Sequence, residues 1–185
     1  MILQSEDVLL GCAEYHPSEN MDDRSPETEV DLLVIHSISL PPGEFGGGWI
    51  DDLFMNKLDV MADPYFAEIK ALKVSCHLLI QRTGKITQYV PLNRRAWHAG
   101  ESHYCGRSCC NDFSIGIELE GSDEIPFTDD QYQALQQVTR EVMHHYPAIT
   151  RDRITSHAAI APGRKTDPGP MFDWPRYLDS ISAPE

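Results

Sequence analysis

Two stretches decide the fold: DLLVIH at residues 31–36 and SIGIELE at residues 114–120. The first is a continuous apolar run, which is typical of a strand buried on both faces, and it ends in His36. The second alternates strictly, so its three aliphatic side chains share one face, while Ser114, Gly116, Glu118 and Glu120 share the other. We therefore expect two buried strands with polar side chains at one edge of a sheet.

Strand and helix signals interleave around these two stretches. A hairpin is expected over 74–90 with its turn at Thr83-Gly84, and a capping box at Thr128 predicts a long helix to Tyr146. The remaining expected elements are short helices at 50–54, 64–72 and 173–181, a strand at 153–156, and loops at 16–29, 37–63 and 161–170. This order predicts a single α/β domain spanning 1–185, with a central mixed β-sheet flanked by helices.

The charge balance excludes several classes of partner. Lysine and arginine together number 15 against 29 acidic residues, a formal net charge of −14. Nucleic-acid binding depends on clustered basic residues, and anionic membranes also attract basic surfaces. With no apolar run of about 18 residues to span a bilayer, we expect neither a nucleic-acid nor a membrane partner.

The cysteines indicate a reducing compartment. Their number, five, is odd, and Cys109 and Cys110 are adjacent, so they make a poor disulfide framework. The spacing of Cys105, Cys109 and Cys110 would fit half of a zinc knuckle, but no second pair follows, which favours free thiols. Residues 1–11 also lack the basic start and apolar stretch of an export signal. We therefore expect a cytoplasmic protein.

Three residues stand where metal ligands would be placed. His36 closes an apolar strand, His157 closes another short strand, and Asp167 follows in a loop stiffened by prolines. Two imidazoles and one carboxylate are a common ligand set for catalytic zinc, which leaves its fourth position to water. Each signal alone is weak, since a histidine at a strand end is usually a boundary residue. The hypothesis rests on their combination.

Two further residues would suit catalysis beside a metal. Glu118 shares a strand face with the small residues Ser114 and Gly116, which are expected to leave space above the sheet for a carboxylate that moves protons. Glu120 has the same parity, so alternation alone does not separate the two glutamates. Lys165 precedes Asp167 by two residues and would stabilise an oxyanion, unless it is simply a solvated loop lysine.

At this point the sequence resembles a known family. The strings that carry the resemblance are HSISLPPGEFGGGWIDDLF, VSCHLLIQRTGKITQYVP, RAWHAGES, CNDFSIGIELEGSD, FTDDQYQAL and RKTDPGPMFDW. They closely match the zinc N-acetylmuramoyl-L-alanine amidases, which are related to T7 lysozyme and the peptidoglycan recognition proteins. The match runs from about residue 30 to 178 and is strongest to the members that act on soluble anhydro-muropeptides.

The resemblance implies a role for each candidate residue. The family's zinc ligands fall on His36, His157 and Asp167, which would hold one Zn²⁺ per chain. Its catalytic glutamate falls on Glu118 rather than Glu120, and its catalytic lysine falls on Lys165. The implied fold is a mixed sheet with flanking helices, and the site would be a groove at the strand ends.

The resemblance also implies a reaction. The enzyme would split the amide between anhydro-muramic acid and L-alanine of the stem peptide during cytoplasmic peptidoglycan recycling. By removing muropeptides that act as signals, it would keep inducible β-lactamase expression low. The partner would then be a small soluble muropeptide, and we expect a monomer. Departures from the family pattern are Ser37, Cys109 and Ala158-Ala159.

Substrate contacts are expected from Ser37, Lys73, His77, Trp97 and His98. Trp97 would supply an aromatic platform in the groove, whereas His77 would equally suit a hydrogen-bonded core position. The alternatives to a recycling amidase are a muropeptide-binding module without catalysis and a lysin-type amidase that degrades the polymeric wall. A zinc-assembled regulator is a further alternative, which the acidic surface does not favour.

Overall fold

The computed structural model describes residues 7–182, so the ends of the expected 1–185 domain, residues 1–6 and 183–185, lie outside the described residues. A six-stranded sheet in the order β1-β5-β4-β9-β3-β10 forms its centre. The strands of this sheet are β1 (Glu14–Tyr15), β3 (Leu32–Ile38), β4 (Leu78–Ile80), β5 (Ile86–Gln88), β9 (Ser114–Glu120) and β10 (Ile154–Ser156). β4 and β5 pair antiparallel and the other pairs are parallel. The predicted α/β class with a mixed sheet is confirmed.

The pairing of β3 with β9 builds the middle of the sheet. Their parallel register runs from Leu32 opposite Ser114 to Ile38 opposite Glu120. Leu33 and Ile35 of β3 and the three aliphatic residues of β9 turn to one face, where they join the largest core cluster, whereas Leu32 and Val34 pack on the other face in a smaller cluster. The predicted alternation of β9 is therefore confirmed, and its polar positions lie on the opposite face.

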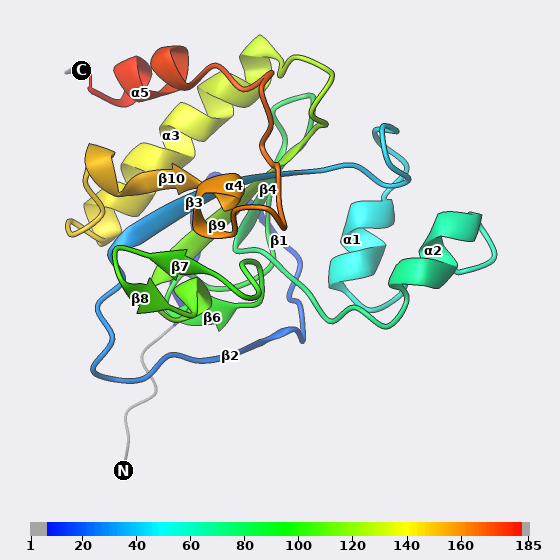
Figure 1. Ribbon diagram of the computed structural model, residues 1–185, viewed down its shortest axis with the longest axis horizontal. Helices are drawn as coiled ribbons and strands as arrows, with labels where there is room; N and C mark the ends of the chain where they lie inside the picture. The colour runs from blue at the N-terminus through cyan, green and yellow to red at the C-terminus, as the bar shows by residue number, and fades with distance from the viewer. Residues whose placement is uncertain (1–6, 183–185) are drawn as a thin grey trace.

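One face of the sheet is covered by α3 (Asp129–His145) and α5 (Trp174–Ser182), which lie side by side in Figure 1. The predicted capping box begins α3: the Thr128 hydroxyl accepts the N–H of Gln131, whose side chain accepts the N–H of Thr128. Leu135 and Val138 on α3 are fully buried against the strands. At the start of α5, Asp173 accepts the N–H of Arg176, as expected for a cap.

The opposite face carries smaller elements. Two two-stranded sheets, η1 (Cys110–Asp112) and α4 (His157–Ile160) lie over it, while α1 (Trp49–Phe54) and α2 (Pro64–Ile69) stand apart beyond the end of β3 (Figure 1). The strands of the small sheets are β2 (Met21–Asp23), β6 (Arg94–Ala96), β7 (His103–Tyr104) and β8 (Arg107–Ser108). These elements leave a groove near the ends of β3 and β9.

The expectation that residues 16–29 form a loop is wrong in its middle. Met21–Asp23 forms β2, which pairs antiparallel with β6. Arg95 on β6 makes a bidentate ion pair with both carboxylate oxygens of Asp22, each at 2.6 Å. No alternation of apolar residues marks this strand in the sequence, because ion pairs to a distant segment stabilise it.

Several element boundaries also differ from expectation. β3 continues two residues past His36, and β4 begins only at Leu78. α2 ends at Ile69 instead of residue 72, and His157 begins α4 instead of ending a strand, because the Ser156 hydroxyl caps that helix. None of these shifts changes the order of the elements.

Two further findings concern the fold as a whole. Within residues 7–182, the helices are too short or too polar to cross a membrane. All five cysteines are described, and none forms a disulfide. The domain is therefore stabilised by its core and its hydrogen bonds.

The first prediction tests the packing of α3. Leu135→Ala removes a fully buried side chain between α3 and the sheet, so the free energy of unfolding should fall by about 2–5 kcal/mol. Urea unfolding followed by circular dichroism measures the change. Gln137→Ala, at an exposed position of the same helix, should change stability by less than about 0.5 kcal/mol, and equal effects of the two variants would contradict this packing.

Candidate functional site

The register of the sheet brings the first two site residues together. His36 on β3 lies directly opposite Glu118 on β9, and register partners in a parallel pair point to the same face. β10 pairs with β3 on its other side, so His157, the residue after β10, arrives at the same edge. The loop after α4 returns Asp167 to this point, and its carbonyl accepts the N–H of Ala158.

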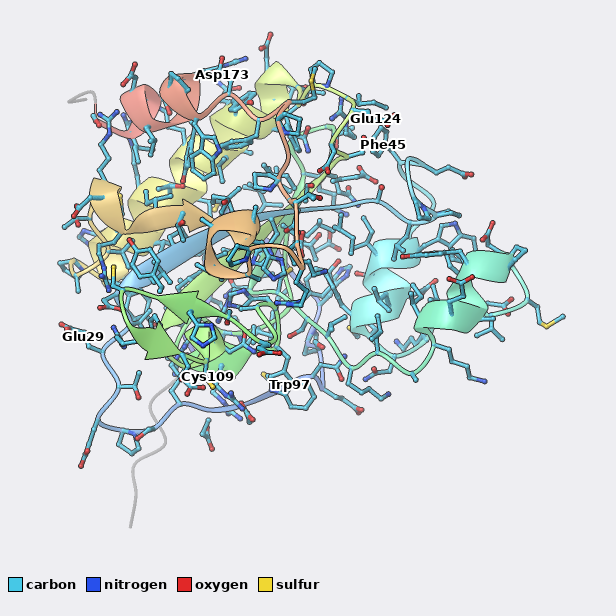
Figure 2. All side chains as sticks on the ribbon, viewed as in Figure 1. Glu29, Phe45, Trp97, Cys109, Glu124 and Asp173 are labelled. Carbon is cyan, nitrogen blue, oxygen red and sulfur yellow. The ribbon has the colours of Figure 1, made fainter. Side chains whose placement is uncertain are left out.

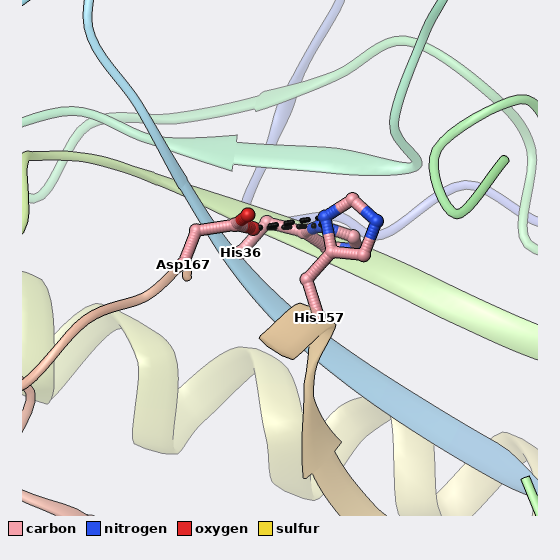
Figure 3. A group of neighbouring side chains, drawn as sticks. All are labelled: His36, His157 and Asp167. Carbon is pink, nitrogen blue, oxygen red and sulfur yellow. Dashed lines mark hydrogen bonds and ion pairs between the residues drawn. The ribbon is translucent and has the colours of Figure 1, made fainter. Parts of the chain in front are cut away.

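His36, His157 and Asp167 form one cluster, drawn in Figure 3. The two Nδ1 atoms are 2.9 Å apart, and Asp167 Oδ2 lies 3.2 Å from His36 Nδ1 and 3.0 Å from His157 Nδ1. Zinc bonds of about 2.0–2.2 Å in a tetrahedron give ligand–ligand edges of about 3.3–3.6 Å. The three ligand atoms would therefore need to move apart by only a few tenths of an ångström to surround such an ion.

The hydrogen bonds on the far side of each histidine ring show which ring nitrogen is available to a metal. His157 Nε2 lies 3.2 Å from the carbonyl oxygen of Ala99, which can only accept, so Nε2 carries a hydrogen and Nδ1 is the nitrogen left to bind a metal. Arg164 donates to the same carbonyl at 2.6 Å and holds it in place. Burial lowers the pKa of His36 to about 4, so this imidazole is neutral at pH 7.

Glu118 borders the cluster with an unused oxygen. Its Oε1 lies 4.0 Å from His36 Nδ1, and its Oε2 is buried without a hydrogen-bond partner among the described residues. Burial, together with the negative charge of Asp167, raises the pKa of Glu118 well above its usual range. A carboxyl group in this state is ready to hold or move a proton.

Glu120 has a different environment, although it shares a strand face with Glu118. Its two carboxylate oxygens accept the backbone N–H groups of Gly46 and Arg82 at 2.5 and 3.0 Å. These bonds tie the 41–48 loop and the end of β4 to the end of β9. The structure thus separates the two glutamates, which alternation alone left equivalent.

A groove of about 510 Å³ opens at the cluster. Lys165 and Arg164 lie at its polar end with His157, Asp167 and Glu118. Its apolar wall comes from β3, the loop after it and the two short helices, and includes Leu40, Leu53, Phe54, Tyr65, Ile69 and Leu72. The Lys165 side chain is exposed in this groove, and its charge opposes the rise in the pKa of Glu118.

The predicted substrate contacts divide into two groups. Ser37 and His98 line the groove, whereas Lys73, His77 and Trp97 are not among its lining residues. Lys73 is exposed and donates to Asn56. Trp97 lies beside the segment that carries β2, as Figure 2 shows. The structure therefore places these three residues outside the groove, and their contact with substrate stays a prediction.

His77 occupies the core position that was its alternative. It is fully buried, its Nδ1 accepts the N–H of Gly116, and its Nε2 donates to the carbonyl of Arg94. The expectation of open space above Gly116 is wrong. The ring of His98 fills it so closely that a Cβ on Gly116 would lie 2.5 Å from the ring.

Sequence reasoning missed one half-buried arginine. The Arg24 guanidinium donates to the carbonyls of Asn111, Asp112 and Ser114, and so fixes the start of β9. It comes from the segment expected to be a loop, about 90 residues away in sequence. A basic residue among acidic loop residues gave no signal for such a role.

The cysteine-rich stretch does not form a metal site. Cys105 and Cys109 are exposed and Cys110 is buried. Within the part of the chain that the structure describes, His36, His157 and Asp167 are the group with metal-ligating geometry, and it includes no cysteine. The expectation of free thiols is confirmed.

Comparisons with known proteins agree with this geometry. A family model described as N-acetylmuramoyl-L-alanine amidase matches residues 26–170. The 1,6-anhydro-N-acetylmuramyl-L-alanine amidase AmpD of Haemophilus influenzae is 58% identical over 174 residues, which cover 94% of this chain and 94% of that protein.

Two solved structures are similar to this one. The crystal structure of a Se-Met AmpD derivative matches with a TM-score of 0.92 and 54% identity, covering 98% of this chain and 100% of that one. The amidase AmiD from E. coli, solved with the substrate anhydro-N-acetylmuramic acid-L-Ala-D-gamma-Glu-L-Lys, matches with a TM-score of 0.60 and 28% identity. That match covers 88% of this chain and 66% of AmiD.

The second prediction compares the two glutamates of β9 in metal-free protein. Because the folded-state pKa of Glu118 is raised, its stabilising contribution is full below its unfolded pKa and is lost as the pH rises. Glu118→Gln should therefore stabilise the metal-free protein by about 1–3 kcal/mol at pH 7, with the gain shrinking towards pH 4. Urea unfolding in the presence of a chelator measures it.

Glu120→Gln is the matched control for this experiment. The substitution replaces a carboxylate that accepts two backbone N–H groups, so it should destabilise the protein at pH 7. If both variants shifted stability in the same direction at pH 7, the different environments assigned to the two side chains would be wrong.

Proposed function

The chain belongs to the N-acetylmuramoyl-L-alanine amidase family. We propose that it hydrolyses the amide bond of its substrate at the cluster of His36, His157 and Asp167, with one zinc ion bound there. The substrate is an anhydro-muropeptide, and the bond broken joins the lactyl carbonyl of anhydro-N-acetylmuramic acid to the L-alanine nitrogen. One observation carries the proposal: three acceptor atoms converge within 3.2 Å beside a carboxyl group with an unused oxygen.

The donor set fits zinc and its chemistry. Two neutral imidazole nitrogens and one carboxylate oxygen would hold the ion and leave a position open towards the groove. When bound, zinc polarises a carbonyl and lowers the pKa of water. The site retains a net positive charge, because one carboxylate offsets half of the charge of the divalent ion.

Glu118 is proposed to move the proton. Its Oε2 accepts a proton from the water that attacks the lactyl carbonyl, and the carboxylic acid then donates that proton to the L-alanine nitrogen as the C–N bond breaks. The raised pKa supports both steps, since it brings the group nearer to the working pH. The products are the free lactyl carboxylate and the peptide amine.

Lys165 is proposed to stabilise the oxyanion that forms on the carbonyl during the attack. Its position in the groove beside Glu118 and its exposed ammonium group support this role. Ser37, on the same groove wall, is proposed to contact the substrate.

We further propose that the protein works on small soluble muropeptides in the cytoplasm, as a monomer in peptidoglycan recycling, and so limits β-lactamase induction. The net charge of −14 opposes docking on an anionic wall, and five free cysteines suit a reducing compartment. A binding module without catalysis would have no need of the unpartnered Glu118 oxygen. A lysin-type amidase would instead release peptide from purified sacculi as fast as from anhydro-muropeptide.

The third prediction tests Glu118. Glu118→Ala should bind zinc in the same amount as the unchanged protein, because Glu118 is not a ligand, while kcat should fall by about 10²–10⁴-fold. Mass spectrometry of the products from a defined anhydro-muropeptide follows the reaction. Hydrolysis by Glu118→Ala at the unchanged rate would contradict the mechanism, and exposed Glu124→Gln provides the control.

The fourth prediction tests Lys165. Lys165→Met keeps the length of the side chain but loses the charge, so kcat should fall by about 10²–10³-fold with little change in KM. The same mass-spectrometric assay at several substrate concentrations separates the two constants. A rise in KM at constant kcat would show that Lys165 binds the substrate in its ground state, whereas Lys70→Met should leave both constants unchanged.

A further inference from the structure

A chain of hydrogen bonds runs from the cluster into the protein interior. His36 Nε2 lies 2.9 Å from His98 Nδ1, and His98 Nε2 lies 3.1 Å from the Ser114 hydroxyl. The Ser114 hydroxyl lies 2.6 Å from the carbonyl oxygen of Cys110. His36, His98 and Ser114 are buried, so water does not compete for these bonds.

The last member of the chain fixes the direction of every bond. The Cys110 carbonyl can only accept, so the single hydroxyl hydrogen of Ser114 is given to it. Ser114 Oγ must then accept from His98 Nε2, which leaves His98 Nδ1 as an acceptor. His98 Nδ1 in turn requires a hydrogen on His36 Nε2, and the lone pair of His36 is therefore placed on Nδ1, towards His157 and Asp167.

Packing holds the middle member of the chain in position. The His98 ring lies against the backbone of Gly116, where a Cβ would lie 2.5 Å from it, and meets the His36 ring edge-on at 5.0 Å. On the main chain, Asn111 Oδ1 accepts the N–H groups of both His98 and Ala99. The ring therefore stays beside His36 without depending on that one hydrogen bond.

We propose that His98 is a positioning residue for the metal ligand His36, and that Ser114 and the Cys110 carbonyl set its tautomer through this chain. This inference rests on the proposed function, because it assigns to His98 the task of presenting a metal ligand instead of contacting substrate. The other His36 tautomer would carry a hydrogen on Nδ1 and block coordination. Hydrogen-bond partners of metal-ligating histidines typically contribute about 10–100-fold to metal affinity.

The tautomers can be read directly in metal-free protein. Two-dimensional ¹H–¹⁵N spectra of protein labelled on histidine distinguish protonated from unprotonated ring nitrogens. We expect His98 to carry its hydrogen on Nε2 at pH 7.5, towards Ser114, and His36 to carry one on its own Nε2, towards His98. A hydrogen on Nδ1 of His98 would overturn the proposal without requiring any variant.

Zinc affinity provides the second readout, measured by competition with a colorimetric chelator and normalised to folded protein. His98→Phe keeps a planar ring but removes both nitrogens, so affinity should fall by about 10–100-fold. His98→Asn places an amide oxygen near the former Nδ1 and should recover part of the loss. If His98→Phe does not fold, Ser114→Ala, which removes the hydroxyl that links His98 Nε2 to the Cys110 carbonyl, should weaken zinc binding in its place.

The possible outcomes separate this inference from the proposed function. Failure of the unchanged protein to bind zinc would contradict the proposed function itself. If the unchanged protein binds zinc and a folded His98→Phe binds it equally well, only the positioning role of His98 is wrong. A loss of thermal stability without a loss of zinc affinity also overturns that role, since it is what a purely structural residue would show.

Discussion

The parallel pairing of β3 with β9 is the constraint on which the rest of the site depends. It places His36 beside Glu118 on one face of the sheet. The aliphatic residues that alternate with these two along β3 and β9 anchor both strands in the core on the other face. A slip of one residue would turn the functional side chain of the shifted strand to the opposite face, away from its partner. β10 extends the same parallel edge and delivers His157, so the ligand geometry follows from the sheet register.

Burial of so many polar groups requires that each be satisfied. The Ala99 carbonyl holds the ring of His157, and two backbone N–H groups occupy the carboxylate of Glu120. Among the buried side-chain oxygens of the described residues, Oε2 of Glu118 lacks a partner, and a buried acceptor without a donor costs about 1–3 kcal/mol. The protein carries this cost where the chemistry takes place.

Local sequence signals were sufficient for the elements that matter most. The apolar run at 31–36, the alternation at 114–120 and the capping box at Thr128 predicted the two central strands and the long helix correctly. The candidates His36, His157 and Asp167 also followed from strand ends and a stiffened loop, and the structure brings them together.

The features that escaped prediction depend on contacts between distant residues. β2 forms because Arg95 pairs with Asp22, 73 residues away, and the apparent space above Gly116 is filled by a ring from another segment. Neither contact leaves a periodic pattern in the chain. From the sequence, the alternation of side chains along a strand shows at most which face of the sheet a histidine lies on. Packing decides that His98, and not His77, reaches the cluster of His36, His157 and Asp167.

The most direct test of the account is an anomalous diffraction map recorded at the zinc absorption edge from crystals of the zinc-loaded protein. The account predicts one strong peak within about 2.0–2.2 Å of His36 Nδ1, His157 Nδ1 and Asp167 Oδ2. A peak at the cysteines instead, or none at this cluster under conditions in which the protein is active, would contradict it.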